Sequence, residues 1–307
     1  MTAIFAFRGI RFAHTKALAS FSRSEQGLIA AAASVIQSAM HIVDELIYER
    51  APKLVVSPVW PVAKPMLYGI LGYRKAVAMA DAIRDLGGPE ALDYISKLLL
   101  LKVAVQGLDN LPATGRCVVV CNHPTGIADG IAVADAIARV RRDAIFFANA
   151  DALRVNGRFN EALIPVEWVA AKRTHAKTKD TLRAAQAAFE AERCVVIFPA
   201  GKLARRDKEG RLVDPAWAPT AVSLAQRHKA PIVPMHLAGP NAFWFHLFNR
   251  FSSELRDITL FHEFLNKAGK RYDLVVGAPI DPQGLETEAL KAYVERQLTT
   301  PDIRFHP

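Results

Sequence analysis

The sequence predicts an α/β fold in which a mostly parallel central sheet carries helices on both faces and follows an N-terminal helical region. The first observation is that, from about residue 100 onward, short apolar runs alternate with longer helical patterns. The second is the three- and four-residue spacing of apolar side chains before that point. The third is composition, since 51% of the 307 residues are hydrophobic and can bury a large core. We therefore expect a helical, membrane-facing region over residues 1–99 and a sheet-containing domain over residues 100–307.

The first 24 residues are basic and contain no acidic side chain. They lack the continuous apolar core of a secretory signal. Three interpretations stay open: a transit-like segment, an amphipathic segment on an anionic membrane, or a frayed basic terminus. Residues 27–48 then show helical spacing of apolar side chains, and their polar stripe argues against a membrane span.

Residues 54–73 are apolar but interrupted. They contain one charge, Lys64, and three prolines, so one regular spanning helix is not expected. Trp60, Tyr68 and Tyr73 are residue types that favour a bilayer interface. The segment either contacts a membrane or covers the substrate, or it is a buried connector under the main domain.

Strand and helix patterns alternate through the rest of the chain. After helices expected at residues 77–86 and 89–101, Lys102–Gln106 is expected to be an edge strand. Such alternation predicts a largely parallel sheet with helices on both faces. The other expected strands are Cys117–Cys121, 144–148, Leu163–Val166, 194–198, 232–237 and 273–276, and the helices between them are 131–140, 177–191 and 218–227.

The turn after Cys121 carries candidate catalytic side chains. Asn-His-Pro-Thr-Gly at residues 122–126 breaks the strand, and Asp129 follows. In an open α/β sheet, ligands usually bind at the carboxyl ends of the strands. A histidine there can act as a general base, and a nearby carboxylate can orient it. His123 and Asp129 are therefore the candidate catalytic pair, and the alternative is a polar turn with a capping aspartate.

A second turn, at the end of the expected strand 194–198, is basic. Phe-Pro-Ala-Gly at residues 198–201 is followed by Lys202, Arg205 and Arg206. Backbone amides at such a turn, together with cations, can bind a phosphate or a carboxylate. Because strand ends of one sheet can converge in space, we favour this interpretation over a solvated basic loop.

A third basic run contains Lys172 and Arg173 and leads into the expected helix 177–191. Cations at a helix entry suit an anion. The alternative is a charged face in contact with water.

Several kinds of chemistry have no support in the sequence. Cys117, Cys121 and Cys194 lie in or beside apolar runs and form neither a metal spacing nor a disulfide framework, which favours a reducing cytoplasm. Walker A, serine-hydrolase and dinucleotide motifs do not occur, and neither do the metal-binding spacings Cys-x-x-Cys and His-Glu-x-x-His. We therefore expect no bound metal. The net charge of +9 favours anionic partners.

Four sequence blocks, in this order, resemble those of the lysophospholipid/glycerolipid acyltransferase superfamily. They are Asn122-His123 with Asp129 downstream, Ile-Pro-Val at 164–166, Phe-Pro-x-Gly at 198–201 and Ile-Val-Pro at 232–234. The resemblance covers roughly residues 100–280. The residues of the first and third blocks are similar to those of a bacterial branch labelled hemolysin-like or lysophospholipid acyltransferases. A glycerolipid acyltransferase-like α/β fold is implied.

The resemblance also implies an activity, the transfer of a fatty acyl chain from acyl-CoA or acyl carrier protein to a lysolipid hydroxyl. His123 would be the general base and Asp129 its orienter. No resident cofactor is implied, and the implied partners are membrane lipids with anionic headgroups. The implied location is the cytoplasm, peripherally on the inner face of the membrane. The implied substrate-binding residues are Asn122, Thr125, Gly126, Lys172, Arg173, Phe198, Pro199, Gly201, Lys202 and Arg205.

Three positions depart from the family pattern. Five residues rather than four separate His123 from Asp129, so we expect His123 to lie in the turn before the helix, with Gly126 permitting that turn. Ala200 replaces the usual glutamate, and Glu-Trp at residues 167–168 replaces the usual arginine. These departures leave the acceptor open, with a lyso-ornithine lipid or another lysolipid as alternatives to lysophosphatidic acid.

Two other classes of function stay in view. One is a non-catalytic peripheral protein that binds anionic lipids on the same fold. The other is nucleic-acid binding, which the basic charge permits but for which no reading helix or stacking motif occurs. We therefore expect no nucleic-acid partner.

Overall fold

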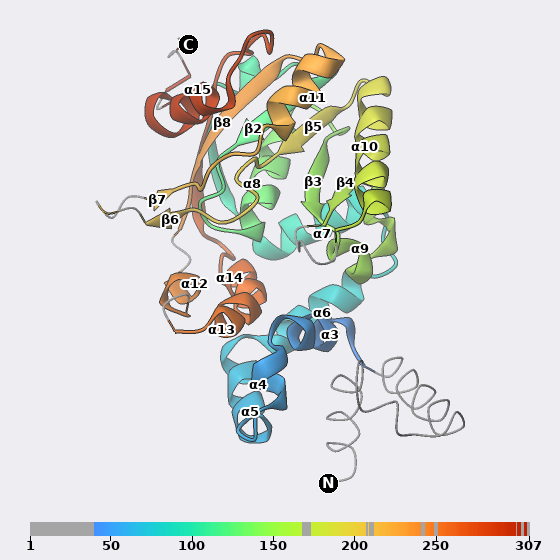
Figure 1. Ribbon diagram of the computed structural model, residues 1–307, viewed down its shortest axis with the longest axis vertical. Coiled ribbons are helices and arrows are strands. Elements are labelled where there is room, and N and C mark those ends of the chain that lie inside the picture. Colours follow the sequence, from blue (N-terminus) through green and yellow to red (C-terminus); the bar gives the residue numbers. More distant parts are fainter. Residues whose placement is uncertain are drawn as a thin grey trace.

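The computed structural model describes residues 40–167, 173–206, 208, 212–240, 243–248, 251–298, 300–301 and 304–305. Its centre is a seven-stranded sheet with the strand order β1-β9-β8-β2-β5-β3-β4 (Figure 1). Neighbouring strands are parallel except that β8 and β9 are antiparallel. The predicted mostly parallel sheet is therefore confirmed. Its strands are β1 (Lys102–Gln106), β2 (Cys117–Cys121), β3 (Ile145–Asn149), β4 (Leu163–Val166), β5 (Cys194–Ile197), β8 (Ile232–Ala238) and β9 (Arg271–Val276).

Helices cover both faces of the sheet, as the alternation predicted. All five residues of β2 are buried, with Val119 in the core of one face and Val118 and Val120 in the core of the other. Burial on both faces is what lets a parallel strand be apolar throughout. The helices of the first face are α7 (Gly88–Leu99) and α8 (Ile127–Ile137), and those of the second are α10 (His175–Glu190), α11 (Thr220–His228) and α15 (Thr287–Ala292).

Short elements join these layers. The most relevant is a two-stranded antiparallel ribbon, β6 with β7, which follows the basic turn after β5. The short elements are η2 (Leu108–Asn110), α9 (Ala152–Val155), η3 (Gly157–Glu161), β6 (Arg205–Arg206), β7 (Leu212–Val213) and η5 (Tyr293–Gln297).

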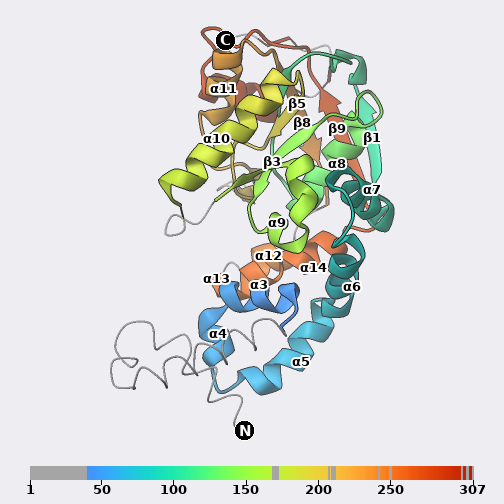
Figure 2. The same ribbon diagram turned by 90° about the vertical axis from the view of Figure 1, so that its right-hand side faces the viewer.

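A smaller helical unit lies below the sheet in Figure 1 and is built from two separate parts of the chain. Its core joins Val43, Ile47 and Trp60 to Ile258, which follows β8 in the sequence. Figures 1 and 2 both show the later helices beside the earlier ones. The sequence did not indicate this contribution from the segment between β8 and β9. The unit contains α3 (Ile42–Arg50), α4 (Pro52–Val56), α5 (Trp60–Ile70), α6 (Tyr73–Ile83), α12 (Phe243–Phe248), α13 (Ser253–Ile258) and α14 (Leu260–Leu265).

Some expectations fall on residues that the structure does not describe. The basic segment 1–24 and most of the expected helix 27–48 lie outside the described residues, and so does Lys172. The domain boundary near residue 100 stays a prediction.

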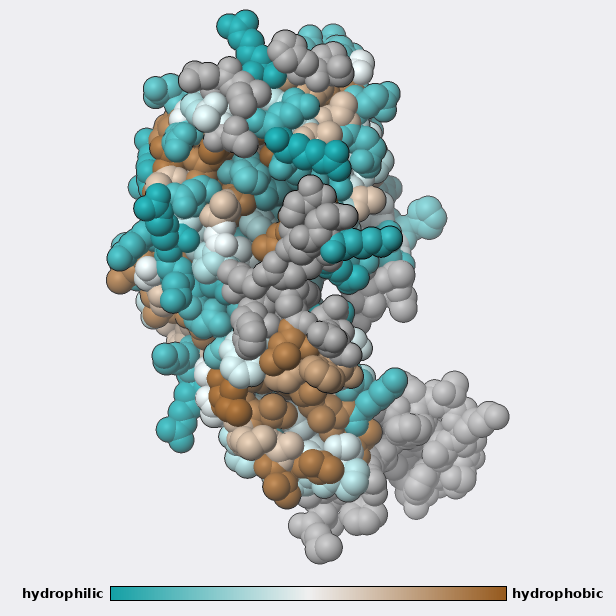
Figure 3. Space-filling view, turned by 90° about the vertical axis from the view of Figure 1, so that its left-hand side faces the viewer, coloured by the Kyte–Doolittle hydropathy of each residue, from teal (hydrophilic) through white to brown (hydrophobic). Residues whose placement is uncertain are grey.

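The apolar segment 54–73 is broken by its prolines, as predicted, into the end of α4 and the helix α5. Val59, Val62 and Met66 are 61%, 78% and 63% exposed, so the buried-connector interpretation is wrong for this face of α5. Figure 3 shows apolar side chains gathered over the helical unit. Over the described ranges, no helix combines the length and apolar character needed to cross a membrane.

Candidate active site

The turn between β2 and α8 brings a histidine and an aspartate together. Helix α8 starts at Ile127 rather than at residue 131, where the sequence pattern placed it. Gly126 precedes the helix with a φ of 117°, in a region that favours glycine. His123 therefore lies in the turn before the helix, as predicted, and Asp129 lies in the first helical turn with its side chain directed back toward the N-terminus.

The two side chains are within hydrogen-bond reach. Nδ1 of His123 lies 2.9 Å from Oδ2 of Asp129. The Asp129 side chain is fully buried, whereas 18% of the His123 side chain is exposed. Because Nδ1 faces a carboxylate, we assign the ring hydrogen to Nδ1, which leaves Nε2 as a proton acceptor. The pair therefore has the geometry of a base with its orienting carboxylate.

Asp129 is held by donors on both of its oxygens. The backbone N–H groups of Thr125 and Gly126 donate to Oδ2 at 2.8 and 3.0 Å, and the Thr125 hydroxyl donates to Oδ1. The same hydroxyl lies 3.0 Å from the hydroxyl of Tyr272 and accepts its hydrogen. Burial, with the charge of Asp129 adding to it, raises the pKa of Tyr272, so the phenol keeps its proton. This network fixes the carboxylate in one position against the imidazole.

A second aspartate, which the sequence did not single out, holds the backbone of the histidine turn. Both carboxylate oxygens of Asp214 lie 3.2 Å from the backbone nitrogen of His123, and Oδ2 accepts from Nε1 of Trp217 at 2.9 Å. Burial raises the pKa of Asp214 to about 6, although the hydrogen bonds from Trp217 and His123 act in the opposite direction. Asp214 is thus a positioning residue. Its partner is 91 residues away in the sequence, and no motif connects the two.

The basic turn after β5 meets the histidine turn, as we expected from the convergence of strand ends in one sheet. The ring centroids of Phe198 and His123 are 4.8 Å apart. The backbone nitrogen of Ala204 donates to the carbonyl oxygen of His123 at 3.0 Å. Lys202 on this turn and Arg205 at the start of β6 are exposed. The structure therefore places two exposed cations on either side of the backbone contact with the histidine turn.

Pro199 and Gly201 shape that basic turn through their backbone. The carbonyl oxygen of Pro199 accepts from the backbone nitrogen of Ala218 at 3.0 Å. Gly201 has a φ of 60°, which lets the chain reverse after the strand. Both residues set the path of the chain that carries the cations.

Two candidate substrate-binding residues have other contacts. The side chain of Asn122 donates to the carbonyl oxygen of Leu237 at 2.9 Å and accepts from its backbone nitrogen at 2.7 Å. This contact joins the end of β2 to β8 and uses both ends of the amide, and the implied role of Asn122 in substrate binding stays a prediction. Arg173 donates to the backbone of Glu167 at 3.4 Å, beyond β4. β4 is three strands from β2, about 14 Å across the sheet, so the contact of Arg173 lies beyond the end of a different strand from the one that carries His123.

Comparisons with known proteins agree with this geometry. The family model described as Acyltransferase matches residues 102–238, which contain β1 to β8 and the histidine turn. Residues 102–238 therefore form an acyltransferase domain, as expected from the resemblance to the glycerolipid acyltransferase superfamily. It is an O-acyltransferase.

Two relatives are lyso-glycine lipid O-acyltransferases. The protein from Phocaeicola vulgatus is 28% identical over 199 residues, covering 63% of this chain and 69% of the relative. The protein from Bacteroides thetaiotaomicron is 26% identical over 224 residues, covering 69% of this chain and 80% of the relative. The 1-acyl-sn-glycerophosphate acyltransferase PlsC from Thermotoga maritima gives a TM-score of only 0.45 at 15% identity, over 77% of this chain and 96% of that structure, and this likeness carries no functional weight.

Proposed function

We propose that His123 is the general base of a direct acyl transfer to a lysolipid hydroxyl. The observation that carries the proposal is the 2.9 Å contact between Nδ1 of His123 and Asp129, which directs Nε2 away from the carboxylate. Nε2 takes the hydroxyl proton as the acceptor oxygen attacks the thioester carbonyl. A C–O bond forms, the C–S bond breaks, and the proton passes to the departing thiolate. Asp129 holds the tautomer and stabilises the imidazolium while the proton is on the ring.

The surroundings of His123 favour direct attack over an acyl-enzyme intermediate. Cys121 is the thiol closest to His123 in the sequence, and it is fully buried at the end of β2. Burial, together with the charges of Asp129 and Asp214, raises its pKa, which disfavours the thiolate form. The Thr125 hydroxyl is engaged with Asp129 and Tyr272. Neither group is placed as a nucleophile.

The substrates follow from the family and from the charge of the site. The acyl donor is acyl-CoA or acyl carrier protein, with no resident cofactor. The names of the two relatives favour a lyso-glycine lipid as the acceptor. The exposed Lys202 and Arg205 bind an anionic part of one substrate beside His123. Roles for Lys172 and Arg173 stay predictions.

Acyl transfer by the purified full chain tests this function. We expect radiolabelled acyl chains from acyl-CoA or acyl carrier protein to appear in a diacylated product when lyso-glycine lipid is supplied. Lyso-ornithine lipid and lysophosphatidic acid are the comparison acceptors. If the folded protein binds lipid vesicles but forms no product with any acceptor or donor, the non-catalytic lipid-binding alternative is the better account.

We also propose that the helical unit docks peripherally on the inner face of the cytoplasmic membrane. The exposed side chains Val59, Val62, Met66 and Ile70 recur at three- and four-residue steps, so they lie along one side of α5. Such an apolar face suits the boundary between headgroups and acyl chains. The net charge of +9 favours anionic lipids, and the three cysteines are free and buried, as suits a reducing compartment.

Vesicle binding tests the docking face. Replacing Val62 and Met66 together by glutamate should weaken co-sedimentation with anionic vesicles at least about tenfold, because each substitution removes the gain from burying an apolar side chain. Leu182→Glu is the matched control, since Leu182 is an equally apolar residue, 46% exposed, on α10 of the sheet domain. Equal vesicle binding by the wild type, the Val62/Met66 double variant and Leu182→Glu would contradict docking through α5.

A further inference from the structure

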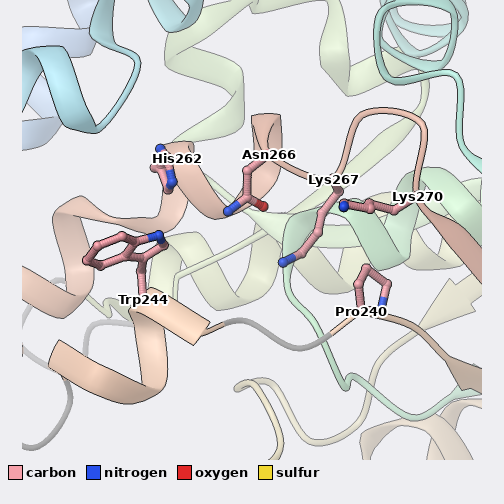
Figure 4. Close-up of a pocket in the computed structure, with 6 residues that line it drawn as sticks. All are labelled: Pro240, Trp244, His262, Asn266, Lys267 and Lys270. Atoms are coloured by element: carbon pink, nitrogen blue, oxygen red, sulfur yellow. The ribbon is translucent and has the colours of Figure 1, made fainter.

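A pocket lies between the helical unit and the start of β9, apart from the basic turn. Its volume is about 440 Å³, which is in the range of small-molecule sites. Figure 4 shows its lining side chains, which come from α12, α14 and the segments that flank them. We call it the lysine pocket, and its lining residues are Pro240, Trp244, His262, Asn266, Lys267 and Lys270.

The lysine pocket adjoins the network that holds Asp129. Pro240 follows Gly239, where an added Cβ would lie 3.0 Å from a methyl carbon of Thr125 and 2.5 Å from the ring of Tyr272. Lys270, on another wall, is two residues before Tyr272. Tyr272 and Thr125 are hydrogen-bonded to each other, and Thr125 to Asp129. Two walls of the pocket are therefore joined along the chain to residues that contact or belong to the network that orients Asp129.

The charges of the lysine pocket leave one cation uncompensated. Lys267 forms an ion pair with Glu263 at 2.8 Å, and both side chains are only 3% exposed, so these charges balance each other. The exposed ammonium of Lys270 has no ion-pair partner in the part of the chain that the structure describes. The pocket is thus matched to a ligand group with a single negative charge.

The lysine pocket also presents an acceptor that has no donor. Oδ1 of Asn266 is buried and accepts no hydrogen bond from the described residues. The other end of the same amide donates to Oε2 of Glu263 at 3.2 Å, which fixes the orientation of the side chain. A buried carbonyl oxygen without a donor is costly, so a ligand N–H that reaches it is favoured.

We infer that the lysine pocket binds the head of the lysolipid acceptor, and that this head is an amino acid acylated on its nitrogen. Its free carboxylate pairs with Lys270, and its amide N–H donates to Oδ1 of Asn266. Trp244 and His262, whose rings meet edge to face at 6.2 Å, border the adjoining methylenes. The inference rests on the proposed function and adds the place and the chemistry of acceptor recognition.

A phosphate monoester suits the lysine pocket less well. It carries up to two negative charges against one unpaired lysine, because Lys267 is already paired with Glu263. It also lacks the N–H that Asn266 requires. With the acceptor head in this pocket, Lys202 and Arg205 are left for the phosphate groups of the acyl donor.

Acceptor analogues test both contacts. The probes are lyso-glycine lipid, the analogue with an ethanolamine head, which lacks the carboxylate, and the analogue with an N-methylglycine head, which lacks the N–H. The wild type should favour the glycine head over either analogue about 10- to 100-fold in kcat/KM. Lys270→Gln should raise KM for the glycine head with kcat unchanged, and should abolish discrimination against the ethanolamine head. Asn266→Leu should abolish discrimination against N-methylation.

Two controls distinguish a failure of this inference from an unfolded variant or a failure of the proposed function. Lys97→Gln removes an exposed lysine of α7 and should leave every ratio at the wild-type value. Thermal unfolding shows whether each variant is folded. This inference alone would be overturned if the wild type transfers acyl chains but folded Lys270→Gln keeps the wild-type kcat/KM ratios between head groups. A change of KM in Lys270→Gln that is confined to lysophosphatidic acid would overturn it as well. Absence of transfer to every lysolipid would overturn the proposed function as well.

Discussion

His123→Ala should lower the rate of acyl transfer about 100- to 10,000-fold while the protein stays folded. The variant removes Nε2, the group that takes the acceptor's proton. The imidazole is partly exposed, and the backbone contacts of His123 with Asp214 and Ala204 do not depend on its side chain. Initial rates with a radiolabelled donor and lyso-glycine lipid measure the loss, and vesicle co-sedimentation should be unchanged.

His228→Ala is the matched control for the loss of an imidazole. His228 stacks on Phe189 at 4.3 Å, and Arg116, just before β2, contacts its carbonyl oxygen. It therefore lies at the opposite end of β2 from His123. Transfer by His123→Ala at the rate of this control would refute the proposed role of His123.

Asp129→Asn should lower the rate by about 100- to 10,000-fold without unfolding the protein. An amide at this position cannot stabilise an imidazolium. Without the carboxylate charge, the ring hydrogen is also held less strongly on Nδ1, so the tautomer with a free Nε2 is less favoured. The fold should survive because the amide oxygen can still accept from the backbone of Thr125 and Gly126.

Two quantities are measured for Asp129→Asn, the rate of acyl transfer and the thermal unfolding of the protein. Asp109→Asn, in the exposed η2 turn, controls for the loss of a carboxylate and should keep wild-type activity. Thermal unfolding of Asp129→Asn should still be cooperative. Wild-type activity in this variant would mean that the 2.9 Å contact positions the turn but has no part in proton transfer.

Much of the fold was predictable because strand burial leaves a local pattern in the sequence. The run Cys117–Cys121 is apolar at every position because both faces of β2 are covered, and this indicated a central parallel strand. The direction of β9 was not predictable. It follows the helices α12 to α14 and runs antiparallel to β8. The local sequence of a strand does not determine which strand it pairs with or in which direction.

The candidate pair was predictable because its residues are close in the sequence. His123 and Asp129 belong to one strand-to-helix turn, and the glycine that permits the turn lies between them. Asp214 and Tyr272 support the same turn from 91 and 147 residues away. Such partners are set by the packing of distant segments, and an ordinary Asp-Pro or Arg-Tyr pair gives no sign of it.

The most direct test of the account is the single-turnover rate of acyl transfer in His123→Ala, Asp129→Asn and the double variant. If Asp129 acts through the His123 imidazole, the aspartate has nothing left to orient once the ring is gone. The double variant should then transfer acyl chains within about a factor of two of His123→Ala alone. Losses that multiply in the double variant would show that the two side chains act independently, and would contradict a base and orienter built on the turn between β2 and α8.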